Sequence, residues 1–424
     1  MGRLIEDYLK LAEYDYKCLE NDSIKNPYCW KDEHAREVLE KLFKIIDKLK
    51  QEKCKREIAG KSEREDCSFY EKCNKSKYEM WKAWKQKNGA DPDDSSRGNA
   101  FARSIYYILW GKRIYAGKEK ESGIHEHGWE NFTTSYLKFQ NSEKLLWGGD
   151  TLNTLASYRV QIEIYRCEEG NKEKVDKMCR RCHQLGNFVL VPAYFNAWRG
   201  FKLQDRMDLA FYVLSEIEDS IDQEKSADDI FSMKALFYEN QKKETDKKWN
   251  DVENDFTVWK KKDFNQYINI FFLWDYVEKK EGEEKYVVKN LQYSENEEKK
   301  SKYITADTIG TYIDNANTYI KRRSIFMAGM VMIALEFEDT EYTGENKAQW
   351  EDWKVSGIYK LIVDKVFLGD TAYSGYGEVI GKIWETIDDK KIKFRDEIKR
   401  EIKHILKKMC EQMKIKDILQ SSKN

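Results

Sequence analysis

Residues 179–200, CRRCHQLGNFVLVPAYFNAWRG, combine side chains that can transfer protons with side chains that can bind anions. A histidine can exchange a proton near neutral pH, an arginine can donate two hydrogen bonds to a phosphate or a carboxylate, and asparagine amides can position a substrate or a water molecule. These residue types predict a polar pocket for a phosphate-containing ligand such as a nucleotide or a nucleic acid. The candidate residues in this stretch are His183, Asn187, Asn196 and Arg199.

The same residue types also have purely structural uses. Arg199 can pair with Asp205 or Asp208 through a salt bridge. Asn187 can serve a turn, and His183 can be a half-buried histidine whose hydrogen bonds are satisfied. The residue types alone therefore leave the catalytic, binding and structural interpretations open.

The beginning of this stretch, CRRCH at residues 179–183, has the spacing of a haem-attachment site and of half a zinc site. Covalent haem attachment belongs to exported proteins, and the first residues of the chain do not form a secretory signal, so we expect no haem. A structural zinc site needs a second ligand pair, and none of the upstream cysteines repeats the C-x-x-C spacing. We therefore expect reduced thiols at Cys179 and Cys182. A divalent-metal site remains an alternative only in the polar pocket.

A second polar segment, GDTLNT at residues 149–154, precedes that stretch. The pair Gly148-Gly149, whose second glycine begins this segment, predicts a turn, after which Asp150 or Thr151 can cap a helix. The functional alternative is that Asp150 orients His183 or holds a divalent metal while Asn153 positions the ligand.

Three segments together resemble the motifs of a family of bacterial proteins that share a domain of unknown function. They are GDTLNT at 149–154, HQLGNFVLVPAYFNAWRG at 183–200 and DRMDLAF at 205–211. The family patterns are G-D-T-x-N, H-x-I-G-N-x-x-x-x-P-x-x-F-N-x-x-R-G and D-x-x-D-L. This resemblance covers residues 145–215 and implies that the matched polar residues share one site. Those residues are Asp150, Asn153, His183, Asn187, Asn196 and Arg199.

The segment HQLGNFVLV, followed by Asn196, is also similar to the second half of the motif of HNH-type nucleases in restriction and defence proteins. This resemblance implies a phosphodiesterase that uses a divalent metal. The upstream His-x-x-Pro strand, which would supply the general base, is missing, since His125 and His127 precede the motif without the proline.

The elements that must position these residues are expected to be mainly helices. The chain has 424 residues, of which 36% are charged and only three are proline, a composition that permits long helices. The run FVLV at residues 188–191 is prone to form a strand and is closed by Pro192. We therefore predict a mainly α, multi-helical fold with a small β element near residues 186–192.

Several further elements follow from the apolar periodicity. We predict a helix within residues 208–221, a short strand at 285–290, and a glycine-rich turn that opens a helix at 373–384. A buried helix is expected at 320–335, beginning with two arginines. Its nearly uncharged part, 324–335, is too short to span a bilayer.

The composition predicts three regions along the chain. Glycine, proline, aspartate and serine cluster at residues 88–99 and mark a break. It separates a basic helical N-terminal region, 1–90, from a central helical domain with the polar motif, 95–340. A C-terminal helical region, 341–424, is expected to end in a basic amphipathic helix.

Two regions are basic although the whole chain, with 75 basic and 76 acidic side chains, is nearly neutral. Residues 41–88 hold 15 Lys or Arg and 8 Asp or Glu, interleaved with aromatic residues, and residues 391–424 hold 11 and 5. Either region can bind a nucleic acid, and the tail 391–424 can also bind a protein partner or dock on its own domain.

These patterns predict a cytoplasmic bacterial protein that does not enter a membrane. Our leading hypothesis is that it acts on or binds a nucleotide or a nucleic acid, with His183 as general acid or base and Arg199 as the anion clamp, as a defence-related nuclease would. The alternative is a non-enzymatic helical interaction protein, a scaffold or regulatory partner in antiviral defence, in which the motif is structural.

Overall fold

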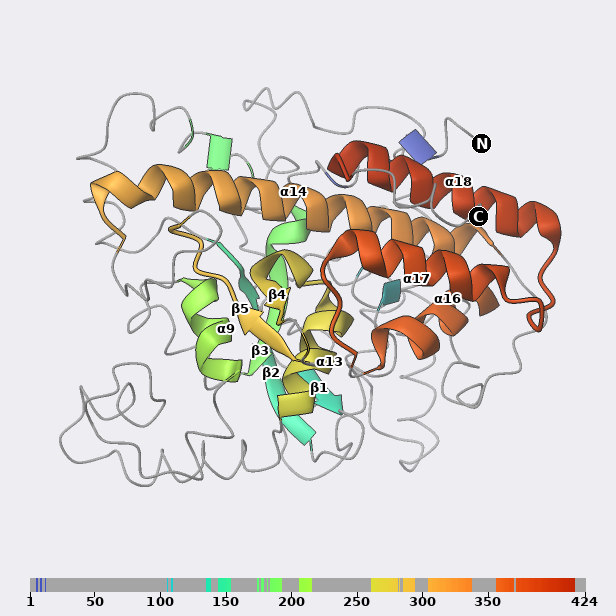
Figure 1. Ribbon diagram of the computed structural model, residues 1–424, viewed down its shortest axis with the longest axis horizontal. Coiled ribbons are helices and arrows are strands. Elements are labelled where there is room, and N and C mark those ends of the chain that lie inside the picture. Colours follow the sequence, from blue (N-terminus) through green and yellow to red (C-terminus); the bar gives the residue numbers. More distant parts are fainter. Residues whose placement is uncertain are drawn as a thin grey trace, which may run out of the picture.

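The protein is mainly α-helical with a small β element, as seen in a computed structural model (Figure 1). The structure describes residues 5–6, 8–9, 12, 105, 108–109, 135–138, 144–153, 174, 177–178, 181, 184–192, 206–215, 261–280, 282, 285–293, 304–337, 356–369 and 371–415.

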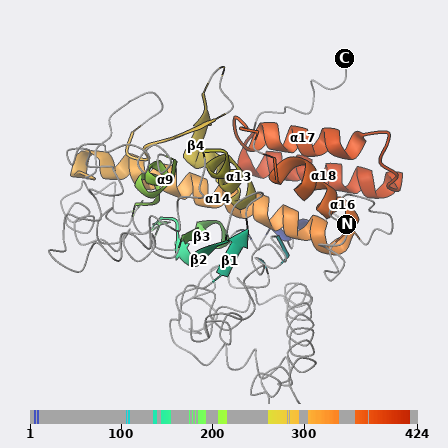
Figure 2. The ribbon, with the colours of Figure 1, turned by 90° about the horizontal axis from the view of Figure 1, so that it is seen from below.

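One long helix, α14, Ala306–Glu336, forms the axis on which the other described elements pack (Figures 1 and 2). Its start is fixed by a reciprocal capping box, in which the side chains of Thr305 and Thr308 each accept a hydrogen bond from the other residue's backbone N–H. None of the described helices has both the length and the apolar character that a bilayer-spanning segment requires.

Three helices of the C-terminal part pack together at one end of α14 (Figure 2). A Cβ atom at Gly329 of α14 would lie only 2.2 Å from the Sδ atom of Met409, so the two backbones approach closely because residue 329 has no side chain. The helices are α16 (Gly357–Ile362), which continues into the π turn η6 (Val363–Phe367), α17 (Tyr376–Asp388) and α18 (Asp396–Met413).

The strands form two separate sheets, which lie on different sides of α14 in the view of Figure 2. A three-stranded antiparallel sheet has the order β1-β2-β3, and a separate hairpin pairs β4 with β5. The strands are β1 (Ser135–Lys138), β2 (Lys144–Thr151), β3 (Phe188–Pro192), β4 (Val277–Lys279) and β5 (Tyr286–Val288). The remaining elements are α9 (Met207–Ser215), α13 (Lys261–Phe271) and the 3-10 turns η4 (Leu185–Asn187) and η5 (Trp274–Tyr276).

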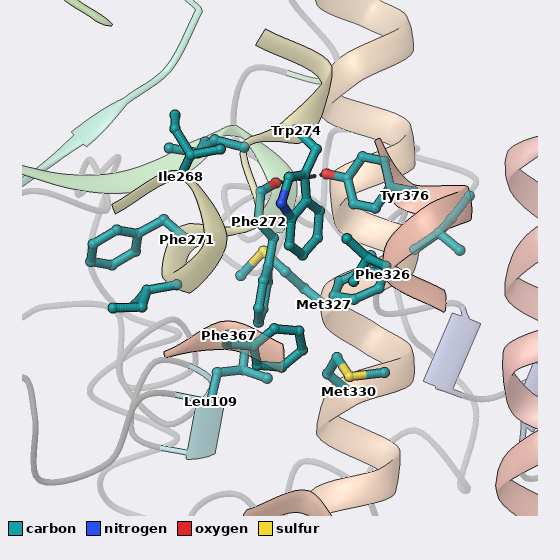
Figure 3. Packing of buried hydrophobic residues seen from close by; sticks show 14 of the residues in the cluster. Leu109, Ile268, Phe271, Phe272, Trp274, Phe326, Met327, Met330, Phe367 and Tyr376 are labelled. Atoms are coloured by element: carbon teal, nitrogen blue, oxygen red, sulfur yellow. Dashed lines mark hydrogen bonds between the residues drawn. The ribbon is translucent and has the colours of Figure 1, made fainter. Parts of the chain in front are cut away.

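Aromatic side chains form the centre of the core between α13, α14 and α17 (Figure 3). The ring of Phe272 packs against those of Trp274, Phe326 and Phe367 at centroid distances of 5.6, 5.0 and 4.8 Å. Phe272 has a left-handed backbone, with φ of 59°, and follows the last residue of α13. A position of this kind usually holds glycine, so the aromatic contacts must offset the backbone strain.

Most elements predicted from the sequence are confirmed. The predicted strands near 186–192 and 285–290 are β3 and β5, and the helix predicted within 208–221 is found as α9. The helix opened by a glycine-rich turn is α17, with Gly375 at φ of 141° before its first residue. The basic amphipathic tail helix is α18, and its apolar face docks on α14 and α17 of the same chain.

One predicted element is wrong, and a second begins earlier than predicted. The Gly-Gly turn and the helix cap at Asp150 or Thr151 are replaced by strand β2, which includes both residues. Pairing with β3 decides this conformation, and local propensity gives no sign of it. The buried helix predicted to begin near residue 320 begins at Ala306, so Arg322 and Arg323 lie in the interior of α14.

One hydrophobic cluster extends from Ile5 to Met413. Buried residues on both sides of position 340 belong to it. The division into 1–90, 95–340 and 341–424 stays a prediction from the sequence. The break at 88–99 and the basic region 41–88 lie outside the described residues.

Candidate functional site

Two of the three motif segments meet in the sheet. Strands β2 and β3 run antiparallel, so that Asp150 lies opposite Val189 and Thr151 lies opposite Phe188. The contact continues past the strands, where the backbone N–H of Leu152 donates to the carbonyl of Asn187 at 2.7 Å. Residues of GDTLNT and of HQLGN, about thirty positions apart in the sequence, are therefore neighbours in space.

Asn153 and Asn187 join these segments through their side chains, and we call this pair the asparagine clamp. The Oδ1 atom of Asn187 accepts from the backbone N–H of Asn153 at 2.8 Å and from its Nδ2 at 3.2 Å. In return, Nδ2 of Asn187 donates to the carbonyl of Asn153 at 2.8 Å. Both residues are fully buried. The clamp thus uses the Asn187 amide to satisfy backbone groups that would otherwise be buried without partners.

The third motif segment reaches the same place through Arg206. Its backbone forms an isolated antiparallel bridge with Asn153. Its guanidinium binds Asp208 in a two-point ion pair, with Nε to Oδ1 at 3.1 Å and Nη2 to Oδ2 at 2.5 Å, and both side chains are 1% exposed. Nη2 also donates to Oδ1 of Asn290 at 3.0 Å. Asp208 therefore has Arg206 as an ion-pair partner, a pairing that the sequence had left open for Arg199.

Tyr276 and Arg323 connect these segments to η5 and α14. Nδ2 of Asn153 donates to the Tyr276 hydroxyl at 2.5 Å, and burial raises the pKa of Tyr276 well above its ordinary value, so the hydroxyl is protonated at neutral pH. Arg323, 1% exposed, donates to the carbonyls of Gly186, Phe188 and Phe271. We call Asn153, Asn187, Arg206, Tyr276 and Arg323 the motif junction.

The glycine of HQLGN has a steric role at this junction. A Cβ atom on Gly186 would lie 2.2 Å from the carbonyl oxygen of Ile320, so only glycine lets η4 lie this close to α14. The backbone N–H of Gly186 then donates to Oγ of Ser324 at 2.7 Å. Gly186 therefore brings the motif within reach of the arginines of α14.

Asp275 lies between the motif junction and the aromatic core. Its Oδ1 atom is 2.9 Å from Nη1 of Arg322, whose guanidinium lies 5.5 Å from the ring centroid of Tyr376. Burial raises the pKa of the Asp275 carboxyl to about 6, against the opposing effect of the positive charges on Arg322 and Lys289. This carboxyl can therefore exchange a proton close to neutral pH.

Four buried polar atoms in this region have no hydrogen-bond partner among the described residues. Such atoms are rare in folded proteins and mark places where a further polar group can bind. Two are donors, on adjacent arginines, and two are acceptors. They are Nε of Arg322, Nη2 of Arg323, Oδ1 of Asn153 and Oδ2 of Asp275.

The outcome for the predicted site residues differs from residue to residue. Asn153 and Asn187 are in direct contact, and the pair of Asp150 with Val189 is separated from them by the pair of Thr151 with Phe188. His183, Asn196 and Arg199 lie outside the described residues, as do Cys179 and Cys182. Among the described residues, no group of three or more His, Cys, Asp or Glu side chains is placed to hold a metal ion.

Sequence reasoning missed four residues of this region, which are Arg206, Asp275, Tyr276 and Arg323. One signal was available, since two adjacent arginines directly precede the apolar run 324–335. Arginines inside a buried helix need partners, and those partners mark the site.

Comparison of the chain with protein-family models, with curated proteins and with solved structures finds no match. Its function must therefore be inferred from the geometry of the motif junction and from the chemistry of its side chains.

Proposed function

We propose that the protein binds a phosphate-containing ligand, of the nucleotide or nucleic-acid class, beside the motif junction. The observation that supports this is convergence: three polar segments meet at Asn153, and the adjacent arginines 322 and 323 of α14 lie next to them. Each arginine has one guanidinium nitrogen without a partner among the described residues. Phosphate oxygens are the acceptors that guanidinium groups bind best.

Each residue has a distinct role in this proposal. Arg323 is held by three backbone carbonyls and supplies a fixed positive charge, while the side chain of Arg322 is 29% exposed and can reach a ligand in solvent. Asp275, with a pKa of about 6, can release its proton or keep it as the local charge requires. The asparagine clamp holds the segments together.

Residues proposed from the sequence complete the site. Arg199 clamps the phosphate, Asn196 positions the ligand, and His183 is the acid or base of any hydrolysis. Asp150, which β2 carries toward the junction, orients that histidine or holds a divalent metal.

A thermal-shift experiment tests this proposal with ATP, GTP, inorganic phosphate and a single-stranded oligonucleotide as probes. A probe at about 100 times its Kd should stabilise the folded protein by about 2.7 kcal/mol. The shift in Tm should decrease in the order wild type, Arg199→Lys and Arg199→Ala, because lysine keeps the charge but loses the two-point geometry.

Arg322→Ala should also reduce the shift, whereas Lys321→Ala, which removes the neighbouring cation of the same helix, should leave it unchanged. Equal shifts in Arg322→Ala and Lys321→Ala, or no shift with any probe, would refute the proposal.

A second candidate function, a non-enzymatic interaction protein, is favoured by one observation. Asn153 binds Asn187 in the asparagine clamp, and Arg206 binds Asp208, so the polar groups of each pair satisfy one another, as structural groups do. This candidate requires Arg199→Ala to lower stability by about 3 kcal/mol or more, as loss of a buried partner does, with no probe bound by the wild type.

A further inference from the structure

Two pairs of arginine with aspartate lie in this part of the molecule, and they differ in how completely their atoms are satisfied. In the first, Nε and Nη2 of Arg206 bind Oδ1 and Oδ2 of Asp208. Oδ2 of Asp208 also accepts from the backbone N–H of Leu291 at 3.0 Å. Both oxygens of this carboxylate therefore have partners, and we call it the closed pair.

The second pair, Arg322 with Asp275, is open by comparison. It is a one-point contact between Nη1 and Oδ1 at 2.9 Å. Nε of Arg322 and Oδ2 of Asp275 are buried and have no hydrogen-bond partner within the described part of the chain. The side chain of Arg322 is partly exposed, so this open pair reaches solvent on its arginine side. A buried donor and a buried acceptor of this kind are costly unless a further group binds them.

Positive charge exceeds negative charge around the open pair. Burial raises the pKa of the Asp275 carboxyl, and the charges of Arg322 and Lys289 oppose that rise, so both cations act on it. Arg323, the next residue of α14, adds a buried guanidinium that three backbone carbonyls hold. In the part of the chain that the structure describes, neither Lys289 nor Arg323 forms an ion pair. A ligand that fits these charges is therefore an anion.

A phosphate group by itself does not satisfy the open pair. Its oxygens accept hydrogen bonds from arginine, but they supply no donor for Oδ2 of Asp275 and their charge repels the carboxylate. The ligand must therefore present a donor beside its anionic group. A ribose hydroxyl both donates and accepts, and a carboxylate binds this hydroxyl in dinucleotide-binding sites.

We propose that Asp275 selects ribonucleotides by accepting a hydrogen bond from a ribose hydroxyl at Oδ2, while Arg322 binds the phosphate. This inference rests on the proposed function and narrows it, from phosphate-containing ligands in general to nucleotides with a complete ribose. Asp275 is then a specificity residue. Its loss should change the choice between ligands more than it changes the affinity for phosphate.

An α-amino acid is another small ligand that presents an anion and a donor together, through its carboxylate and its ammonium group. A neutral amino acid carries no net charge, however, and leaves the excess of positive charge around Asp275 without compensation. Each phosphate of a nucleotide brings negative charge to the site. The charge balance around the open pair therefore favours a nucleotide.

Isothermal titration calorimetry of the full chain tests this inference with ATP, 2′-deoxy-ATP, 3′-deoxy-ATP, inorganic phosphate and L-alanine as probes. The wild type should bind ATP about tenfold or more tightly than at least one deoxy analogue, because a hydrogen bond to a charged acceptor is lost. In Asp275→Ala this preference should fall below about threefold, because the acceptor is gone. Asp275→Asn keeps the size of the side chain but not its charge, so its preference should lie between the two.

Asp314→Ala is the matched control. It removes an exposed carboxylate that pairs with Lys174, on the same helix as Arg322. Its preference for ATP over the deoxy analogues should equal that of the wild type. Melting temperatures of the three variants verify folding, and the comparison of ATP with its analogues in the wild type needs no variant.

Equal affinity of the wild type for ATP and both deoxy analogues would overturn this inference, whereas the proposed function would stand because phosphate-containing probes bind. Tighter binding of L-alanine than of ATP would also overturn it, as would a loss of preference in Asp314→Ala as large as that in Asp275→Ala. Absence of binding by every phosphate-containing probe would overturn the inference and the proposed function together.

Discussion

The motif junction and the aromatic core are held by the same two elements, α14 and η5, but by opposite kinds of contact. The three consecutive residues of η5 each contact a different part of these two regions. Trp274 packs in the aromatic core (Figure 3), Asp275 pairs with Arg322, and Tyr276 receives a hydrogen bond from Asn153. A 3-10 turn has three residues per turn, so successive side chains point in three directions.

The difference between the two regions lies in how replaceable their contacts are. Each ring of the aromatic core touches several others, and dispersion contacts are small and numerous. In the motif junction each polar group has one to three specific partners, and removing a side chain leaves its partners buried and unsatisfied. The junction should therefore be the more sensitive region to a single substitution, although the aromatic core buries more apolar surface.

The largest expected effect is at Arg206. Replacing it by alanine leaves the carboxylate of Asp208 buried without its cation, and we expect the free energy of unfolding to fall by about 4 kcal/mol. Urea unfolding measures this loss. Lys382→Ala, which breaks the exposed pair with Glu385, should change stability by less than about 1 kcal/mol. If both variants lost the same small free energy of unfolding, the buried ion pair would contribute no more to stability than the exposed one.

We expect a smaller loss of stability from substitutions in the aromatic core, at Phe272, whose backbone is left-handed. Phe272→Ala should lower stability by about 3 kcal/mol, since it removes a buried ring. Phe272→Gly should lose about 1 kcal/mol less than Phe272→Ala, because glycine adopts the left-handed backbone without strain. A glycine variant less stable than the alanine variant would show that the backbone at position 272 is not strained.

Local patterns allowed much of the aromatic half to be predicted from the sequence. The continuous apolar run 324–335 indicates a buried helix, and the apolar residues of α18 recur at three- and four-residue intervals, which is sufficient to predict a helix and its buried face. The start of α14 was missed because its first turns are polar outside one stripe. The capping pair Thr305 and Thr308 was the available signal.

The sequence could identify candidate residues of the motif junction, but it could not predict the contacts between them. Resemblance selected Asn153 and Asn187, but their mutual bonds depend on strand pairing between residues 34 positions apart. Strand β2 was misread for the same reason, because its partner β3 is distant in sequence and glycines alone indicate a turn. Tyr276 carried no local signal, since its partner Asn153 is set by tertiary packing. The ion-pair partner of Arg206 lies only two positions away in DRMDLAF, but the contacts of Arg206 with Asn153 and Asn290 depend on the fold.

The smallest expected effect is at the border of the two regions, in the pH dependence of Asp275. The groups that face its carboxyl are Arg322 of α14, Lys289 after β5 and Tyr376 of α17. Burial raises the pKa of this carboxyl from 3.8 to about 6, so the folded protein binds the proton more tightly than the unfolded chain does. Stability should therefore fall as the pH rises from about 4 to about 6, and Asp275 should add no further change above that range.

Between pH 5 and pH 6 the loss due to Asp275 should be about 1 kcal/mol, taken as the difference between wild type and Asp275→Asn in urea unfolding at each pH. The amide has no proton to lose, so the difference isolates this carboxyl from the other acids. Glu385→Gln, on the exposed side of α17, should follow the wild type across the same range. A difference between wild type and Asp275→Asn that stays constant from pH 5 to pH 6 would mean that Arg322 keeps the carboxylate charged. Asp275 would then belong with the closed ion pairs of the motif junction and could not serve as a proton-exchanging group at its border.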